Sequence, residues 1–288
     1  MRLIASILLL ATCAYAEIGN VYDLTQPVTY ENAGGNNWIL RYTSSGAPAL
    51  PDPFAWWKMT ATGTNATQIL DFSTTGLNNA SNKPSVAMGP ALVTTNGVFY
   101  TFDGSDDRFS VTNATGFNTP TCFTVTAWAY MTAEPSAGGN RILYNHSTTN
   151  DAILQLIFTA KSGVSHPTPQ FRTKSVFMFG RITAPASCIW LASKTSPSIN
   201  AWQFMTVVWD GGFASNSASY YLNGVKDTGF TTNQGSFVGI TGIVANLTIG
   251  NNSLGNGSQF QGGIDDPRWY TNALTSNQIY QLYTTGRQ

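Results

Sequence analysis

The stretch that decides the fold is FQGGIDDPRWY, which runs from Phe260 to Tyr270. Two glycines lie near its start, two adjacent carboxylates lie in its middle, and an apolar run closes it. A similar combination of aromatic residue, glycine and paired aspartates lies upstream, in FDGSDDRF at residues 102–109. We interpret residues 260–270 as the last strand of a β-sandwich that the earlier strands leave open.

Short strand-like segments, separated by turn residues, fill the chain from Phe54 onward. Residues 122–130 alternate apolar residues with threonine, and residues 202–209 form a near-continuous apolar run that indicates burial on both faces. The Asn223-Gly224 pair between strand residues is the signal of a type I′ hairpin. This pattern predicts an all-β fold, a two-sheet antiparallel β-sandwich (jelly roll), rather than alternating strands and helices.

One short C-terminal helix is expected directly after the last strand. Thr275, with Gln278 three positions later, forms a capping-box pattern. Ile279 and Leu282 share one face, and Gly286 is a typical helix terminator. We expect this helix to pack beside the last strand and to be structural.

The N-terminus has the features of a secretory signal peptide over residues 1–16. An apolar run at residues 3–10 precedes an A-x-A cleavage site at Ala14–Ala16, so the mature chain is expected to begin at Glu17. A lipoprotein signal ending at Cys13 is the alternative. The apolar run is too short to span a bilayer. We therefore expect a secreted or cell-surface protein without membrane insertion.

Residues 17–53 differ from the rest of the chain and are expected to form an N-terminal arm. Two alternating apolar runs flank the turn-forming residues 32–37, which predicts a hairpin or a pair of extended segments. Residues 44–53 contain three prolines and are interpreted as a linker to a sandwich domain over residues 54–288. The apolar arm positions proposed for assembly are Tyr22, Leu24, Val28, Tyr30, Trp38 and Leu40.

The composition is unusually poor in charge. Charged residues make up 10% of the chain, against roughly 25% in an average domain, and the formal net charge is zero. Removal of the signal takes away Arg2, one positive charge, and so leaves a net charge of about −1. No basic patch suited to nucleic acid is present. A near-neutral surface favours self-association.

Cys122 and Cys188 remain after the signal is removed. An even number of cysteines in an oxidising compartment favours a disulfide between them. The alternative is two buried free thiols, because sequence alone does not show whether the two Cα atoms lie close enough for a bond.

Several segments, in their order and spacing, together resemble the concanavalin A-like, laminin G-like jelly-roll superfamily in its secreted single-domain form. The resemblance covers about residues 54–285 and leaves the arm outside. It implies the jelly-roll fold, and functions that include lectins, adhesion modules, enzyme appendages and some glycanases. The segments are Trp56-Trp57, Leu70–Ser73, Phe102–Asp107, Phe123–Val125 with Trp128, Trp202–Gly211, Tyr221–Gly224, Ile249-Gly250, Gly263–Asp266 and Ala273-Leu274.

The sequence argues against an enzyme. Glycanases of the family that the chain resembles use paired acidic residues, usually in a Glu-x-Asp-x-x-Glu pattern. Here the three glutamates, Glu17, Glu31 and Glu134, are far apart and none lies in that pattern. His146 and His166 form no zinc-ligand spacing, and no nucleophile-elbow motif occurs. We expect no catalytic residues and no certain cofactor.

Calcium is the one ion for which the sequence offers ligands, since it prefers carboxylate and carbonyl oxygens. Asp106, Asp107, Asp265 and Asp266 come from strands that the resembled family places near one another. Asp103 and Asp210 are further candidates. The alternative is that these aspartates bond to backbone amides in turns, as aspartate readily does. On a regular strand, Asp265 and Asp266 would point to opposite faces.

Asn-x-Ser/Thr sequons mark candidate glycosylation sites, which would place those asparagines on a glycoprotein surface. A chain this rich in asparagine, serine and threonine contains several by chance. The candidates are Asn65, Asn79, Asn113, Asn145, Asn251 and Asn256.

Two functions follow from these features. The first is a non-catalytic extracellular structural or adhesive protein, such as a self-assembling fibre or surface-layer subunit joined through its arm. The second is a lectin-like, carbohydrate-binding module that uses rim loops and calcium. The partners expected are other copies of the chain or extracellular glycans, and neither nucleic acid nor a membrane interior.

Overall fold

The structure is a computed structural model that describes residues 28–32, 38–42, 49–59, 68–82, 90–94, 97–111, 117, 120–133, 140–147, 152–158, 174–181, 187–240, 247–251 and 259–287. The chain divides into two compact units, Met1–Ala49 and Leu50–Gln288. In the described part of the chain, no helix is long and apolar enough to cross a membrane.

In the first unit, β1 (Val28–Asn32) and β2 (Trp38–Tyr42) form a two-stranded antiparallel sheet. Val28 lies opposite Tyr42, and Asn32 lies opposite Trp38. The two runs therefore pair antiparallel, in the register expected of the two strands of a hairpin. Tyr22 and Leu24 lie outside the described residues.

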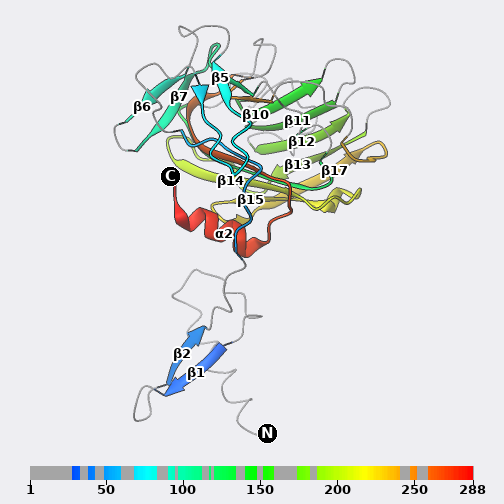
Figure 1. The fold of residues 1–288 in the computed structure, drawn as a ribbon. Helices are drawn as coiled ribbons and strands as arrows, with labels where there is room; N and C mark the ends of the chain where they lie inside the picture. The colour runs from blue at the N-terminus through cyan, green and yellow to red at the C-terminus, as the bar shows by residue number, and fades with distance from the viewer. Residues whose placement is uncertain are drawn as a thin grey trace. The chain divides into compact units, whose positions relative to one another are not determined.

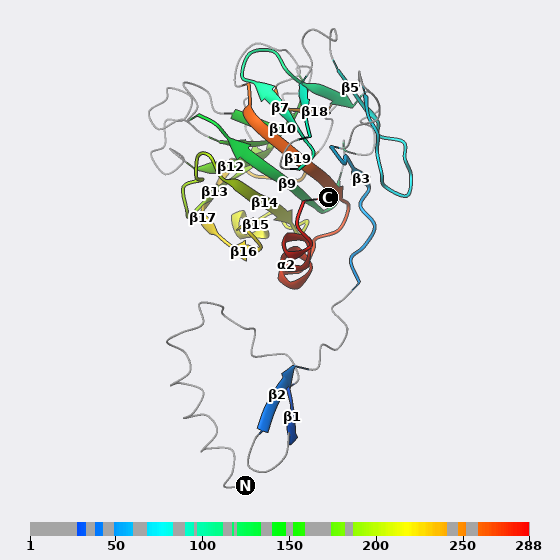
Figure 2. The ribbon, with the colours of Figure 1, turned by 90° about the vertical axis from the view of Figure 1, so that its left-hand side faces the viewer.

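The second unit is a sandwich of two sheets, which Figures 1 and 2 show face to face. The nine-stranded sheet has the order β17-β13-β12-β11-β10-β18-β8-β5-β4, and the eight-stranded sheet has the order β16-β15-β14-β9-β19-β7-β6 with β3 beside β19. All strand pairs are antiparallel. The predicted all-β jelly-roll class is confirmed.

The strands of the sandwich are short and follow the apolar runs of the sequence. Their bounds are β3 (Ala55–Trp56), β4 (Gln68–Ile69), β5 (Ala80–Asn82), β6 (Ala91–Val93), β7 (Phe99–Asp103), β8 (Phe109–Val111), β9 (Phe123–Met131), β10 (Asn140–Ser147), β11 (Ala152–Phe158), β12 (Ser175–Arg181), β13 (Ser187–Ser193), β14 (Trp202–Trp209), β15 (Ala218–Leu222), β16 (Val225–Lys226), β17 (Thr228–Gln234), β18 (Leu247–Ile249) and β19 (Gln261–Tyr270). A short 3-10 helix, η5, spans Ser215–Ser217.

The last strand, β19, closes the eight-stranded sheet as expected, because it pairs with β7, β9 and β3. Its inward residues Ile264 and Trp269 join the main core between the sheets. Trp269 packs on Phe117 and Phe123, with ring centroids 5.1 Å apart in both pairs. Trp269 is fully buried, so β19 is anchored through one of the largest side chains of the core.

The outer face of the eight-stranded sheet is covered in part by α2 (Ser276–Thr285), which lies against β14 and β15 in Figures 1 and 2. Alternate residues of β9 and β14, among them Trp128, Phe204 and Val208, form a second apolar cluster with Ile279 and Leu282 of α2. Both faces of β14 are therefore buried along most of its length, as its apolar run predicts.

Two local predictions are confirmed at single-residue level. Thr275 caps α2 and exchanges hydrogen bonds with Gln278 in a complete capping box. Asn223 and Gly224 have φ angles of 51° and 79°, as a type I′ turn requires, and Leu222 pairs with Val225 across it.

Candidate functional site

The turn from Asp103 to Asp107 joins β7 to β8 and so crosses from one sheet to the other at the rim of the sandwich. Gly104 takes a left-handed φ of 80°, which lets the chain reverse. The Asp103 carboxylate accepts a hydrogen bond from the Ser105 amide at 2.7 Å. The Asp107 carboxylate accepts one from the Asp103 amide at 2.8 Å. We call residues 103–107 the acidic turn.

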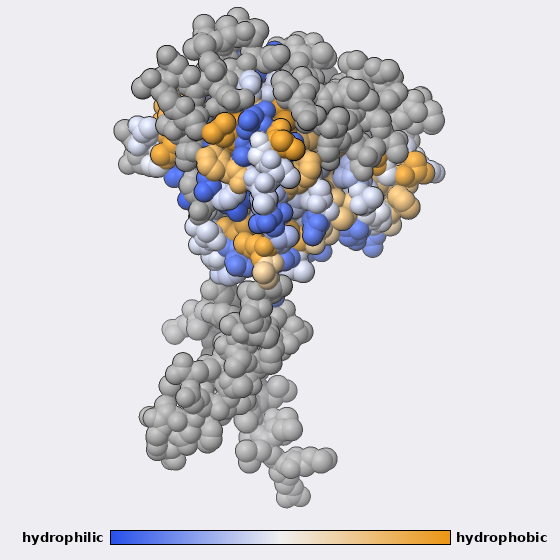
Figure 3. Space-filling model, viewed as in Figure 1, coloured by the Kyte–Doolittle hydropathy of each residue, from blue (hydrophilic) through white to orange (hydrophobic). Residues whose placement is uncertain are grey.

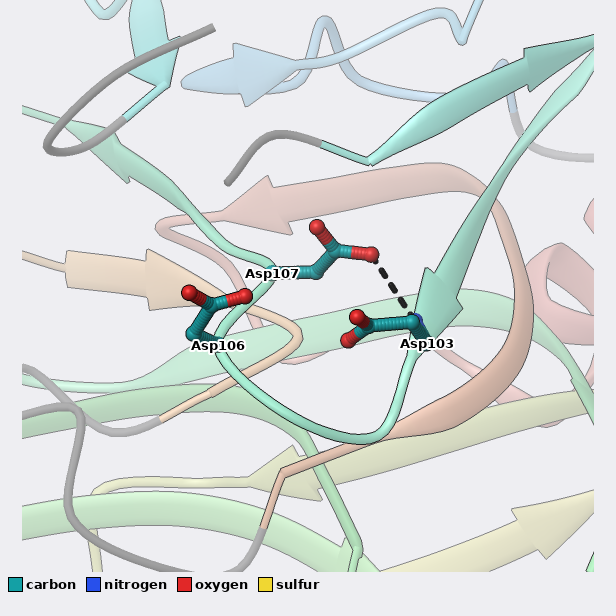
Figure 4. A group of neighbouring side chains, drawn as sticks. All are labelled: Asp103, Asp106 and Asp107. Carbon is teal, nitrogen blue, oxygen red and sulfur yellow. Dashed lines mark hydrogen bonds between the residues drawn. The ribbon is translucent and has the colours of Figure 1, made fainter. Parts of the chain in front are cut away.

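The acidic turn gathers three carboxylates, from Asp103, Asp106 and Asp107 (Figure 4). One carboxylate oxygen from each lies within 4.8 Å of the other two. Asp103 is exposed, Asp106 is half-buried and Asp107 is buried. Burial raises the pKa of Asp107, and the negative charges of Asp103 and Asp106 add to the increase. Closely spaced carboxylates of this kind are the ligands that a hard divalent cation such as Ca²⁺ prefers.

Asp265 and Asp266 lie in a different environment from the acidic turn. The pairing of β19 with β9 shifts register between Asp265 and Arg268, and Asp266 has a left-handed φ of 53°. This bulge, which contains Pro267, breaks the regular alternation expected of the strand. As a result both carboxylates are buried, each 1% exposed.

Asp266 is held by two side-chain donors. Arg268 binds it through Nε at 3.2 Å and through an Nη2 atom at 2.5 Å, and Trp56 donates its indole N–H to the same carboxylate. The guanidinium of Arg268 also lies 4.3 Å from the centroid of the Trp56 ring. Burial raises the pKa of Asp266, and the ion pair with Arg268 opposes that increase. This arrangement is a structural ion pair beneath an aromatic ring.

Asp265 has weaker partners. In the part of the chain that the structure describes, neither of its oxygens accepts a hydrogen bond, and the nearest cation is Arg287, with Nη1 3.9 Å from Oδ2. Burial raises the pKa of Asp265 to about 7, helped by the charge of Asp266 and opposed by Arg287. This buried carboxylate therefore titrates near neutral pH.

The predicted calcium ligands are thus only partly brought together. Asp106 and Asp107 lie with Asp103, which was a further candidate, whereas Asp265 and Asp266 are not in this group and face Arg287 and Arg268. The four-residue set expected from the sequence is corrected to a group within one turn. Each carboxylate of β19 instead faces an arginine: Asp266 is paired with Arg268, and Asp265 faces Arg287 from the segment after α2.

Two other aspartates have structural roles. Asp71 accepts hydrogen bonds from the amides of Trp56, Ser73 and Asn78 and from the Asn78 side chain, at 2.9–3.0 Å. Asp210 accepts one from the Gly212 amide at 2.8 Å, which closes a turn. The turn-capping alternative therefore holds for Asp210.

The predicted disulfide between Cys122 and Cys188 is wrong, because both thiols are free. Cys122 precedes β9 in the eight-stranded sheet, and its thiol faces the Thr271 carbonyl at 3.2 Å. Cys188 lies in β13 of the other sheet, where it accepts from the Trp190 indole at 3.1 Å. Burial raises the pKa of the Cys188 thiol.

The glycosylation candidates divide by accessibility. Asn251 is completely buried, so the prediction that it is an accessible loop site is corrected. Asn79 is half-buried, and its side-chain oxygen accepts from the Asp71 amide at 2.8 Å. Asn145 lies within β10. Asn65, Asn113 and Asn256 lie outside the described residues, as do Glu17, Glu134 and His166.

Sequence reasoning missed a group of aromatic side chains on the outer face of the eight-stranded sheet. Phe99 of β7, Tyr130 of β9 and Trp202 of β14 are each only partly buried. The ring centroid of Trp202 lies 5.0 Å from that of Phe99 and 5.6 Å from that of Tyr130. We call these three residues the aromatic surface. No local sequence signal predicts it, because its members come from three separate strands.

Figure 3 shows one face of the molecule, on which small hydrophobic areas alternate with hydrophilic ones over the described residues. Exposed large apolar side chains in the described part include Phe213 at 58% and Val238 at 69%. Scattered exposure of this kind is ordinary for a folded domain.

Solved structures with the same architecture come from several kinds of protein. One is domain 4 of AbnA, a GH43 extracellular arabinanase from Geobacillus stearothermophilus solved in complex with arabinotriose. The structural match covers 81% of this chain and 98% of that domain, with a TM-score of 0.56 and 16% sequence identity. The match to the binding domain of Paraclostridial Mosquitocidal Protein 1 covers 81% of this chain and 52% of the toxin chain, with a TM-score of 0.56 and 13% sequence identity.

The match to Trypanosoma rangeli sialidase covers 82% of this chain but only 33% of the enzyme chain, with a TM-score of 0.51 and 15% sequence identity. The chain thus spans nearly all of the arabinanase domain, about half of the toxin domain and a third of the sialidase. At these identities the likeness establishes the fold. A comparison with curated proteins finds no sequence relative.

A family model, Laminin_G_3, described as the concanavalin A-like lectin/glucanases superfamily, matches residues 103–280, which is more than half of the 288-residue chain. The match begins at the acidic turn and ends within α2. The order of strands and the closing role of β19 agree with the resemblance seen in the sequence. The chain therefore belongs to the Laminin_G_3 family of the concanavalin A-like lectin/glucanase superfamily.

Proposed function

We propose that this protein is a non-catalytic, extracellular, lectin-like module that binds carbohydrate and holds a calcium ion at the acidic turn. The observation that supports it most directly is the approach of three carboxylates within 4.8 Å at the rim of the sandwich. Three negative charges this close repel one another, and a bound divalent cation would offset that repulsion.

The structural neighbours support the carbohydrate part of the proposal. The arabinanase domain that matches over nearly its whole length was solved with arabinotriose, and the toxin neighbour is a binding domain. Lectin function needs no acid–base pair, which is consistent with glutamates that lie far apart in the sequence. Glu31 belongs to the first unit, in β1, and not to the sandwich.

The test is a glycan-binding screen of the mature chain in calcium and in chelator. The proposal expects binding to at least one class of glycan, weakened at least tenfold by chelator and by the Asp106→Asn substitution. Asp210→Asn, at an exposed turn on another loop, is the matched control and should bind normally. Absence of binding under both conditions would overturn the proposal, and hydrolysis of the glycan would overturn its non-catalytic part.

Self-assembly through the N-terminal arm is a second candidate function. It is supported by the two-stranded sheet that β1 and β2 form within the first unit, considered by itself. An isolated two-stranded hairpin is at best marginally stable in water, so added strands from another copy would stabilise it. The apolar positions Val28, Tyr30, Trp38 and Leu40 lie in these two strands.

Sedimentation of the mature chain, and of a form that begins at Leu50, tests the assembly role. A concentration-dependent oligomer that disappears in the shortened form supports it. An oligomer that persists without the arm, or a monomer at every concentration in the full chain, rules it out. Since the shortened form retains the complete second unit, its folding can be checked by its near-ultraviolet circular dichroism.

A further inference from the structure

Arg287, in the segment after α2, is surrounded as a bound cation is surrounded by its binding site. Its guanidinium lies 4.0 Å from the centroid of the Trp202 ring and 5.7 Å from that of Phe99. Its Nη1 atom is buried and lies 3.9 Å from the Asp265 carboxylate. A further interaction also holds this side chain. Residues of β7, β14 and β19 therefore enclose one guanidinium group.

Two members of the aromatic surface, Phe99 and Trp202, form the walls around this guanidinium. Their rings meet edge to face, with centroids 5.0 Å apart and planes at 82°. A Cβ atom at Gly263 would lie 2.9 Å from Trp202 and 3.0 Å from Phe99, closer than carbon atoms normally approach, so glycine lets both rings lie over β19. The faces of aromatic rings attract cations, and the attraction is strongest for tryptophan.

Gly97, which precedes β7, makes room for the guanidinium itself. It has a left-handed φ of 110°, and a Cβ atom at this position would lie 2.8 Å from Nη2 of Arg287. A larger residue here would strain the backbone and press on the guanidinium. The close approach of backbone and guanidinium at this point therefore depends on glycine.

Asp265 forms the floor, and it needs a positive charge above it. The side chain is 1% exposed, and within the described residues neither of its oxygens accepts a hydrogen bond. The charged groups that face it are Asp266 and Arg268 of its own strand, and Arg287. A buried carboxylate is costly unless a cation neutralises it. Any cation of suitable shape, from this chain or another, would meet that need.

The segment that carries Arg287 can leave without unfolding a strand or helix. α2 ends at Thr285, and the Gly286 amide closes it by donating to the Tyr283 carbonyl at 3.0 Å. A Cβ atom at Gly286 would meet no other atom within 4 Å, so the backbone beside Arg287 has open space around it. Rotation at this point would move Arg287 and leave the helix cap in place.

We propose that Gly97, Phe99, Trp202 and Asp265 form a binding site for a guanidinium group, which Arg287 fills within the chain and an arginine side chain of a partner protein fills in its place. We call these four residues the cation site. A guanidinium is planar, so it stacks on aromatic rings while it pairs with a carboxylate. Arg287 is then an autoinhibitory contact, because the partner's arginine must displace it. This binding activity is separate from glycan binding and does not depend on it.

The test is calorimetric titration of a chain that begins at Glu17 with capped arginine, N-acetyl-arginine methylamide. Capped citrulline has nearly the same shape without the charge, and capped lysine has the charge without the planar group. The chains compared are the unmodified chain, Arg287→Ala, and Arg287→Met, which keeps most of the length of the side chain. Lys226→Ala removes an exposed cation from β16 and is the matched control.

Arg287→Ala and Arg287→Met should bind capped arginine at pH 8.5 with a Kd on the order of 1 mM. The unmodified chain and Lys226→Ala should bind it roughly tenfold more weakly, because the tethered Arg287 competes at a high effective concentration. Capped lysine should bind more weakly than capped arginine, and capped citrulline should not bind. Capped arginine should also raise the Tm of Arg287→Ala more than that of the unmodified chain.

Further changes in the Arg287→Ala chain locate the site. Asp265→Asn should weaken the binding of capped arginine roughly tenfold or more, as loss of a charged partner does, and Trp202→Phe should weaken it less. Affinity should fall between pH 8.5 and pH 6, because burial raises the pKa of Asp265 to about 7 and the loss of Arg287 raises it further. Asp265→Asn should remove this pH dependence.

Four results would overturn the inference. No binding of capped arginine by Arg287→Ala or by Arg287→Met would remove the site. Equal binding of capped citrulline would remove the ligand class, and binding unchanged by Asp265→Asn would place the ligand elsewhere. Equal affinity in the unmodified chain and Arg287→Ala would remove the autoinhibitory role of Arg287. None of these results would alter the proposed glycan-binding function, which the chelator and Asp106→Asn test by themselves.

Discussion

The carboxylate of Asp265 and the guanidinium of Arg287 form an ion pair of 3.9 Å, in which the acid is 1% exposed and no hydrogen bond reaches either of its oxygens from the described residues. The pair joins β19 to the segment that follows α2. Arg287 is in turn stacked on Trp202 of β14. Three parts of the chain are thus linked through one buried charge.

The pH dependence of stability follows from the raised pKa of Asp265, which is about 7 when folded against about 3.9 when unfolded. The folded state therefore binds one more proton than the unfolded state between these values. The free energy of unfolding should fall as pH rises from 4 to 7, by at most ~4 kcal/mol from this group. Denaturant unfolding at several pH values measures the slope.

Asp265→Asn removes the titrating group while keeping its shape. The variant should match the unmodified chain near pH 5, be more stable near pH 8, and lose most of the slope between them. Asp266, Arg268 and Arg287, the charged groups around it, stay in place. Asp52→Asn removes the same charge at an exposed position and serves as control. An unchanged slope in Asp265→Asn would show that other groups cause the pH dependence.

Calcium should stabilise the fold through the acidic turn. A ligand that binds the folded state at a concentration 100 times its Kd adds about 2.7 kcal/mol to the free energy of unfolding. We expect calcium to raise the Tm of the unmodified chain and to have little effect on Asp106→Asn. In chelator, Asp106→Asn should be at least as stable as the unmodified chain, because one of three mutually repelling charges is gone. An equal response to calcium in both proteins would contradict the site.

The two cysteines should behave as separate thiols with different accessibility. Cys122 is half-buried and should react with a thiol reagent in the folded protein, whereas Cys188 is completely buried and should react only on unfolding. Mass spectrometry of a chain that begins at Glu17, alkylated in denaturant without reductant, should show two additions. No addition under these conditions would indicate a disulfide.

The capping box of α2 should contribute measurably to stability. The Thr275 hydroxyl accepts from the Gln278 amide at 3.3 Å, and the Gln278 side chain accepts from the Thr275 amide at 2.9 Å. Thr275→Ala should lower the free energy of unfolding by about 1 kcal/mol, and Thr275→Ser should retain most of it. A loss as large in the serine variant as in the alanine variant would argue against the hydroxyl as its cause.

The parts of the fold that the sequence predicted are those governed by local chemistry. The Asn223-Gly224 turn needs two left-handed residues in succession, and few other residue pairs allow that. The cap at Thr275 needs one hydroxyl and one amide at fixed spacing. The apolar run of β14 indicates burial on both faces of the strand. The sequence does not show that α2 packs on the outer of these two faces.

The parts of the site that the sequence does not predict depend on sheet order, on a bulge and on partners from other segments. A regular strand would send Asp265 and Asp266 to opposite faces, but the bulge at Pro267 breaks that alternation, so that Asp265 faces Arg287 after α2 and Asp266 faces the nearby Arg268. Compartment and number favour a bond between Cys122 and Cys188, but the fold places Cys188 in β13 of the nine-stranded sheet and Cys122 just before β9 of the other sheet. The aromatic surface draws on β7, β9 and β14, whose adjacency around β19 is a property of sheet order.

The complete burial of Asn251 has a consequence for the biosynthesis of this chain. Its sequon is intact in the sequence, so a glycosylating host would recognise it while the nascent chain is still extended. In the folded domain the same side chain has no room for a sugar, because Asn251, two residues after the end of β18, has no exposed surface. Glycosylation of Asn251 and folding of the domain would then compete kinetically. Chains glycosylated at Asn251 before they fold would not reach the native state.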